Sequence, residues 1–341
     1  MSDDRIYLDA QAGQAPKPAV LELAKAMLGL SWNDGKSRNH EAAIAQNAQE
    51  IAIQTVANRL SLSPSQVIPV HRLGNVFDVL SGTFPDVAKS AAARKGAIQS
   101  FAGPVLPVDQ SGRISKFDGF SSFFAPAANQ ETGVIEDINS IIEQSGAFAI
   151  VDATEWIGRV QNLPAGNILI ARASAWGGPN SVCYIISKSE NLRIDSRKLT
   201  SLGPSNFDLL WASAAFEQLD DISKTENQIR NFSIAICEKL SQYEEITIHG
   251  DKNALPHLIS FDIKNVDSET AAIVFDKHAV AVGSGSACAI TYSQSSHVLE
   301  AMGIKSAGNV RLSIPIDFTE SHLEQFLEKI PAIVQELTQA L

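Results

Sequence analysis

Apolar residues recur along this chain at spacings that predict helices alternating with buried strands. Residues 18–30 and 41–60 have apolar positions three and four residues apart, which is the pattern of amphipathic helices. Short apolar runs bounded by Gly, Pro or Asp occupy residues 148–151, 168–171 and 182–186. Such runs are typical of buried parallel strands. Their alternation with helices predicts an α/β sheet.

The pattern changes beyond Ser223, where a second unit is predicted. Its elements are a helix at residues 224–243, strands at 245–249 and 257–263, a helix at 268–277, strands at 280–282 and 310–313, and a helix at 320–340. A further strand is predicted at residues 6–8. A segment of about 115 residues has the size of a domain. We therefore predict a large α/β domain over residues 15–223 and a small α+β domain formed by residues 224–341 together with residues 1–14.

The composition is that of a globular protein, and the charge disfavours one class of ligand. Of 341 residues, 45% are apolar and 19% are charged, and the net charge is −11. Nucleic-acid-binding surfaces are basic, so we predict no nucleic acid partner. No apolar run reaches the ~18 residues of a membrane span, and the acidic residues 1–5 differ from a signal peptide. We predict no membrane contact, a cytoplasmic location and, since no histidines or cysteines have metal spacing, no metal site.

The three cysteines fall into two kinds. Cys183 and Cys237 lie in apolar runs, and we predict that both are core thiols. Cys288 ends a loop of Gly, Ser and Ala that follows a predicted strand. A thiol in such a loop is presented to a substrate or partner, although a glycine-rich turn with an incidental cysteine has the same sequence.

The loop that ends at Cys288 resembles the active-site loop of cysteine desulfurases, whose cysteine takes sulfur as a persulfide. The similarity continues in order along the chain, in Ile6-Tyr7-Leu8-Asp9, Ser37-Arg38-Asn39-His40, Asn129-Gln130-Glu131-Thr132-Gly133, Val151-Asp152-Ala153-Thr154, Gly178-Pro179 and Arg311-Leu312-Ser313. This resemblance implies the pyridoxal phosphate (PLP)-dependent transferase type I fold, with a mostly parallel seven-stranded sheet. It also implies a homodimer, PLP as cofactor, and L-cysteine or a sulfur-acceptor protein as partner.

The resemblance assigns a role to four residues. Cys288 carries the sulfur, and Arg311 binds the substrate carboxylate. Asp152 pairs with the pyridinium nitrogen of PLP, and Asn129 contacts the phenolic oxygen of its ring. The residues alone leave other roles open: a helix cap for Asp152, a loop-stabilising hydrogen bond for Asn129 and a surface ion pair for Arg311.

Other positions depart from the family pattern. Ala175 falls at or next to the position of the lysine that forms the Schiff base, and no lysine occurs between Lys116 and Lys188. The turn that should cradle the phosphate, residues 70–75, has one glycine and no hydroxyl, although Arg72 offers a positive charge. No histidine between His71 and His249 is present to stack on the ring. Glu155 adds a negative charge that is unfavourable unless it is paired.

Three functions remain open from the sequence, which does not decide whether the chain is an enzyme. The first is a cysteine desulfurase-like protein, degenerate in PLP chemistry, that offers Cys288 as a sulfur or redox thiol or acts as a partner subunit. The second is an active PLP-dependent cysteine desulfurase or class-V aminotransferase-type enzyme. The third is a non-catalytic structural or regulatory protein. The joint departures favour the first, and a site filled by Trp176, Phe123 or Phe124 would favour it further.

Overall fold

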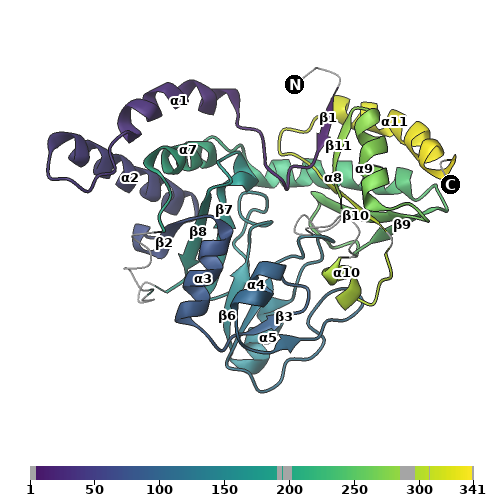
Figure 1. Cartoon of the computed structure of the whole chain (residues 1–341), viewed down its shortest axis with the longest axis horizontal. Coiled ribbons are helices and arrows are strands. Elements are labelled where there is room, and N and C mark those ends of the chain that lie inside the picture. The colour runs from purple at the N-terminus through teal and green to yellow at the C-terminus, as the bar shows by residue number, and fades with distance from the viewer. Residues whose placement is uncertain (1–4, 190–193, 195–201, 285–295, 307, 340–341) are drawn as a thin grey trace.

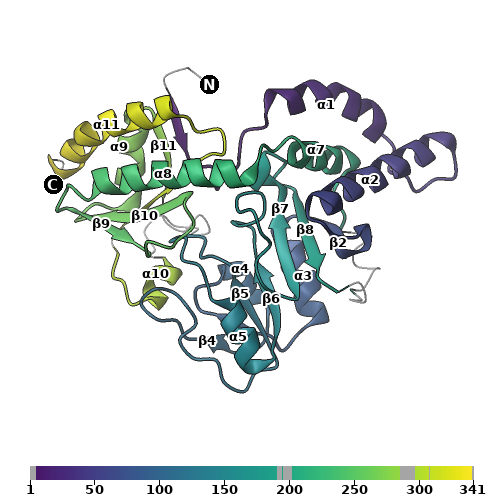
Figure 2. The same cartoon turned by 180° about the vertical axis from the view of Figure 1, so that it is seen from behind.

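The polypeptide forms two sheets, each with helices packed against it (Figures 1 and 2). The computed structural model describes residues 5–189, 194, 202–284, 296–306 and 308–339. One sheet has seven strands and the other has five. No helix in these described ranges combines the length and apolar character that crossing a membrane requires.

The seven-stranded sheet has the order β2-β8-β7-β6-β5-β3-β4. Its strands are β2 (Val67–His71), β3 (Ala88–Ser90), β4 (Val105–Leu106), β5 (Ser122–Pro126), β6 (Phe148–Asp152), β7 (Ile168–Arg172) and β8 (Val182–Ser187). The pairs that join β4, β3, β5, β6 and β7 are all parallel. The predicted mostly parallel seven-stranded sheet is therefore confirmed.

The prediction that residues 182–186 form a parallel strand is wrong. The strand exists, but β8 runs antiparallel to both β7 and β2. The segment between β7 and β8 holds only the 3₁₀ turn η2 (Ala173–Trp176) and a glycine-proline turn. A parallel return needs a crossover connection of a dozen or more residues, so this short segment reverses the chain.

Helices cover both faces of the seven-stranded sheet because its strands carry apolar side chains on both sides. Val151 points to a core shared with α2 (His40–Arg59) and α7 (Asn206–Glu217). Its neighbour Ile150 points to a second core under α3 (Leu73–Thr83) and α4 (Lys95–Ser100). The short α5 (Ile138–Ser145) contributes to the first core. This three-layer arrangement leaves the carboxyl ends of the parallel strands as the place for a site.

The five-stranded sheet has the order β1-β11-β12-β10-β9 and joins the two ends of the chain. Its strands are β1 (Ile6–Leu8), β9 (Ile246–His249), β10 (Leu258–Ile263), β11 (Val280–Ser284) and β12 (Asn309–Ser313). The helices around it are α8 (Ile222–Leu240), α9 (Ser268–Lys277) and α11 (Glu320–Gln339), whereas the short α10 (His297–Ala301) packs in a separate cluster with Ala92. Every strand and helix predicted beyond Ser223 is confirmed within a few residues, whereas the exact domain boundary stays a prediction.

The first two helices form an arm that projects from the body (Figure 1). In α1 (Pro18–Ser31), which packs on α7, only Val20 and Met27 are buried. Large apolar side chains on α1, on α2 and between them are exposed, namely Leu21, Leu23, Leu28, Leu30, Trp32, Ile44 and Ile51. The predicted helices at 18–30 and 41–60 are therefore confirmed, but much of their apolar surface faces outward.

Candidate functional site

Buried charged side chains gather where β6 and β7 end. Asp152 is the last residue of β6 and only 4% exposed, and Arg172 is the last residue of β7. Glu155 follows Asp152 by one turn and is also buried. Because parallel strands present their carboxyl ends at one edge of the sheet, these three side chains lie together.

Arg94, which directly precedes α4, holds this cluster together. Its Nε donates to Oδ2 of Asp152 (2.8 Å), and its Nη2 donates to Thr154 Oγ1 (2.9 Å) and Glu155 Oε1 (2.7 Å). The second oxygen of Asp152 accepts hydrogen bonds from the Thr154 amide (3.0 Å) and hydroxyl (2.6 Å). Both oxygens of the Asp152 carboxylate thus have partners from the protein itself.

Glu155 is paired with two arginines, so its buried negative charge is balanced. Its Oε1 accepts from Nη2 of Arg172 (2.9 Å) as well as from Arg94. Burial acts to raise the pKa of Glu155, but Arg172 and Arg94 together lower it to about 2. Burial acts to lower the pKa of Arg94, and Asp152 with Glu155 raises it instead. Glu155 and Arg94 are therefore charged at neutral pH.

The residues of this cluster do not fit PLP. The family pattern assigns Asp152 to the pyridinium nitrogen, yet both carboxylate oxygens already accept hydrogen bonds, Oδ2 from Arg94 Nε and Oδ1 from Thr154. Ala175, at or next to the expected lysine position, lies buried in η2. In the described part of the chain, no lysine ammonium bonds to Asp152 or Glu155. We derive no chemical step through the cofactor.

Arg94 is the side chain bonded to Asp152 and Glu155, and the three aromatic residues considered from the sequence are engaged elsewhere. Trp176 donates through Nε1 to Ala212 O (3.0 Å) and stacks against Tyr184 and Phe216. Phe123 and Phe124 lie on β5 in the two cores on opposite faces of the sheet. These aromatic side chains therefore support the fold around the site.

Asn129 stabilises its own loop, which was the alternative to cofactor binding. Its Oδ1 accepts from the Glu131 amide (2.8 Å) and the Thr132 amide (3.1 Å), and its Nδ2 donates to Ala92 O (3.1 Å). The bond to Ala92 ties this loop to the segment that carries Arg94. Asn129 thus positions the site through the backbone.

Arg311 lies at the same site but has a separate environment. It is buried on β12, where burial lowers its pKa and the carboxylates of Glu131 and Asp9 act against that shift. A Cβ placed on Gly283 would lie 2.9 Å from Arg311 Nη2 and 3.0 Å from Asp9 Oδ1. The Arg311 guanidinium and the Asp9 carboxylate thus both lie close to one point, yet the described residues show no ion pair between them. Within the described part of the chain, Asp9 Oδ1 and Arg311 Nε are both buried and have no hydrogen-bond partner.

His257 is a buried histidine beside the arginines. Burial, helped by the positive charge of Arg159, lowers its pKa to about 3, so the ring is neutral at pH 7. Its Nε2 has no hydrogen-bond partner within the described part of the chain. This position of His257 was not predicted, because His257 is far along the chain from Asp152.

Burial weakens the acidity of both described cysteines. Burial raises the pKa of the Cys183 thiol to about 12, and burial also raises the pKa of half-buried Cys237. Cys183 is a core thiol, as predicted, whereas Cys237 is only partly buried against the core of the five-stranded sheet. Cys288 lies outside the described residues. Among those that are described, no group of His, Cys, Asp and Glu side chains could hold a metal ion.

The turn expected to cradle a phosphate lies between a strand and a helix. It connects β2 to α3, and Arg72 at this turn is exposed with a positive φ of 64°. No side chain caps the helix there. The Arg72 side chain is not part of the Asp152 cluster.

Sequence analysis missed Arg94 and Arg172, the two cations of the cluster. A signal was present, because two carboxylates so close to the end of a buried strand need positive partners. The interval in which a stacking histidine was expected contains Arg94. The hydrophobic pattern does not say which arginine folds back onto Asp152.

Comparisons with known proteins agree with this fold. The aminotransferase class-V family model matches residues 203–326. A cysteine desulfurase of Sinorhizobium fredii is 29% identical over 69% of this chain and 67% of its own length. The cysteine desulfurase IscS of Methylobacillus flagellatus is 22% identical over 97% of this chain and 93% of its own.

Solved structures show the same architecture. A NifS-like protein superposes with a TM-score of 0.83 at 18% identity, covering 98% of this chain and all of its own. A cysteine desulfurase from Thermococcus onnurineus gives a TM-score of 0.83 at 16% identity, covering 98% of this chain and 96% of its own. The predicted type I fold is confirmed by these matches.

Proposed function

We propose that this chain, which belongs to the cysteine desulfurase family, no longer uses pyridoxal phosphate and serves as a non-PLP partner or thiol protein. The family is PLP-dependent, so the cofactor is the expectation from which the chain departs. The observation that carries the proposal is the guanidinium of Arg94 bonded to both Asp152 and Glu155.

The energetics of the cluster argue against displacement of Arg94 by a cofactor. Removing one partner from a buried ion pair costs about 3–5 kcal/mol, because the remaining charge is stranded. A ring nitrogen at Asp152 would replace only one of the bonds that Arg94 makes, and Glu155 would keep Arg172 alone. Without a nearby lysine, no covalent bond to the cofactor offsets this cost.

Arg311 and Asp9 support our proposal that the protein still binds a small amino acid. Arg311 and Asp9 present unpaired groups of opposite charge toward one point. Such a pair matches a zwitterion such as L-cysteine, whose carboxylate would bind Arg311 and whose ammonium group would bind Asp9. We propose that Cys288 acts as a thiol, or carries a persulfide by taking the outer sulfur from the persulfide of a partner protein, whose thiol is then released. This role rests on the resemblance of its loop.

The exposed arm supports a homodimer. Leu28 and Trp32 are 57% and 71% exposed, and they share the arm with five other exposed apolar side chains. Monomeric soluble proteins rarely leave large contiguous apolar patches exposed. A second copy of this chain is the occupant that we propose for this surface.

Cofactor reconstitution tests the main proposal. The purified chain, incubated with PLP, is expected to show no visible absorption band after desalting and no labelled peptide after borohydride reduction. Ala175→Lys alone should stay unlabelled, because Arg94 still holds Asp152. The double variant with Arg94→Ala is expected to bind more PLP than either single variant. A borohydride-stable adduct in the unmodified chain would refute the proposal and favour an active desulfurase.

Alkylation tests the thiol. With iodoacetamide at pH 8, Cys183 is expected to stay unmodified in the folded protein because its pKa is about 12. Cys288 is expected to react first, and Cys237 provides an internal comparison. Equal, slow modification of all three would favour the purely structural alternative.

Sedimentation analysis tests the dimer. Leu28→Glu and Trp32→Glu should shift the protein toward monomer. Ile273→Glu, on α9 and 62% exposed, is the matched control and should leave the assembly unchanged. A monomeric parent protein would remove this part of the proposal.

A further inference from the structure

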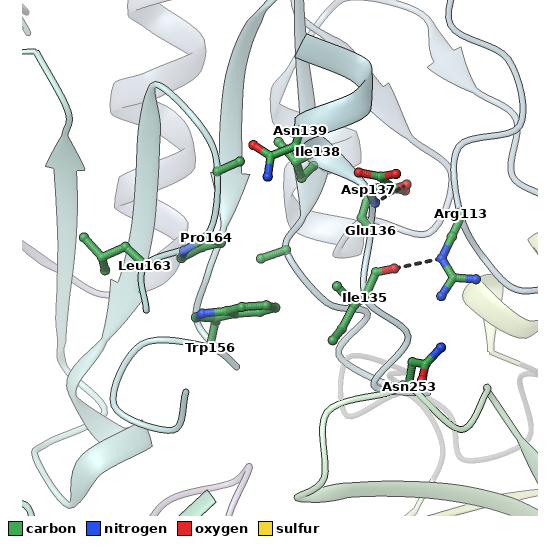
Figure 3. A pocket seen from close by; sticks show the side chains of 12 residues that line it. Arg113, Ile135, Glu136, Asp137, Ile138, Asn139, Trp156, Leu163, Pro164 and Asn253 are labelled. Atoms are coloured by element: carbon green, nitrogen blue, oxygen red, sulfur yellow. Dashed lines mark hydrogen bonds between the residues drawn. The ribbon is translucent and has the colours of Figure 1, made fainter. Parts of the chain in front are cut away.

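The loops that follow β5 and β6 also line an open pocket. It has a volume of about 480 Å³ and is completed by Asn253, from the segment before β10 (Figure 3). Its walls include Ala127, two residues before Asn129, and Trp156, the neighbour of Glu155. The pocket thus shares its loops with the Arg94 cluster, but none of the cluster's charged groups lines it.

Trp156 provides a fixed flat surface in this pocket. Its Nε1 donates to Asn162 O at 2.6 Å, which sets the orientation of the ring. In Figure 3 the ring is seen edge-on between Pro164 and Ile135. Leu163 adds to the apolar wall. An aromatic face held in place between aliphatic side chains suits a second planar ring.

The polar groups at the pocket favour a ligand without negative charge. Arg113 already has partners in the protein, since its Nε donates to Ile135 O at 2.8 Å and its Nη2 pairs with Asp251. Hydrogen bonds from Ser140 lower the pKa of Asp137, so this carboxylate is ionised at neutral pH. A phosphate or carboxylate on the ligand would therefore meet a negative charge with no free cation to balance it.

Two exposed amides supply hydrogen bonds to an uncharged ligand. Asn139, on α5, and Asn253 both line the pocket (Figure 3). Each amide has both a donor and an acceptor, which complement the edge of a nitrogen heterocycle. Small-molecule pockets usually have volumes of about 300–1,000 Å³ and a mostly apolar lining with a few polar groups.

We propose that this pocket binds a small, uncharged, planar nitrogen heterocycle of nucleoside size, stacked on Trp156 and hydrogen-bonded by Asn139 and Asn253. The net charge of −11 argues that the ligand is a free molecule and not a base within a nucleic acid. The site is independent of whether PLP binds at Asp152.

Calorimetric titration of the full chain with adenosine, uridine and AMP tests the proposal. Saturable binding of adenosine or uridine is expected, with AMP weaker than adenosine. Trp156→Leu should weaken binding about fivefold or more, since base–aromatic stacking contributes at least that factor. Asn253→Ala, in an exposed loop, should weaken it about threefold and remains informative if Trp156→Leu does not fold. Ile234→Ala, on α8 and 52% exposed, is the control and should bind as the parent does.

Three outcomes would overturn the proposal. The first is the absence of saturable binding of either nucleoside at millimolar concentration. The second is tighter binding of AMP than of adenosine, which would show that the pocket selects an anion. The third is unchanged affinity in folded Trp156→Leu and Asn253→Ala, which would place the nucleoside elsewhere.

Discussion

Removing the Arg94 side chain should destabilise the protein far more than removing an exposed arginine. Arg94→Ala deletes three hydrogen bonds, two of them to the carboxylates of Asp152 and Glu155, which are nearly inaccessible to solvent. Hydrogen bonds to charged groups contribute about 1.5–3 kcal/mol each. Breaking a buried pair from one side costs about 3–5 kcal/mol in all. We expect a loss in that range.

Urea denaturation followed by tryptophan fluorescence measures the loss, with Arg230→Ala as the matched control. Arg230 forms a partly exposed pair with Glu226 at 3.2 Å along α8, and such a pair on a helix is worth about 0.3–0.5 kcal/mol. Substituting Asp152→Asn in the Arg94→Ala background should recover part of the stability, because one stranded charge is then removed. A loss below about 1 kcal/mol, similar to that of Arg230→Ala, would refute the view that Arg94 neutralises the cluster.

Three further predictions concern pH and backbone space. The pKa of His257 is about 3 in the folded protein, below the ordinary value of 6.5. Because the unfolded chain then binds a proton first, the stability should fall as the pH drops from about 6.5 toward 3. His257→Gln should flatten this slope in denaturation curves recorded from pH 4 to 8. Glu155, lowered to about 2, should contribute stability that is complete above pH 4.5 and lost as the pH falls toward 2, and this acid loss should shrink in Arg94→Ala. Gly308→Ala should strongly lower the melting temperature, because its Cβ would lie 2.3 Å from the backbone nitrogen of Ser268. Gly29→Ala, in α1, meets nothing within 4 Å and should raise the free energy of unfolding by about 0.5–1 kcal/mol. Equal melting temperatures for the two variants would contradict this reasoning.

Strong local patterns made part of the fold predictable. The helices α1, α2, α8, α9 and α11 each carry an apolar stripe or a clear capping residue, such as Asp267 before α9, which accepts from the Glu269 and Thr270 amides. Elements without such a signal were missed. The strand β3 has three residues, which is too short for an alternation to register. The helix α7 is buried between α1, α2 and the sheet, so its apolar residues do not form a single stripe.

In the candidate site, too, some features were predictable from the sequence and others depended on the tertiary structure. By itself, the sequence determined that Asp152 ends a buried strand, that no lysine stands near the expected position, and that the order of motifs matches the cysteine desulfurases. Only the tertiary structure decided that Arg94, 58 positions earlier in the chain, bonds to Asp152, and that β8 runs antiparallel to its neighbours. Periodicity and motifs report what adjacent residues prefer. The partner of a buried charge depends instead on which distant segments the sheet order brings together, and here the parallel pairing of β3 with β5 and of β5 with β6 places Arg94 over the end of β6.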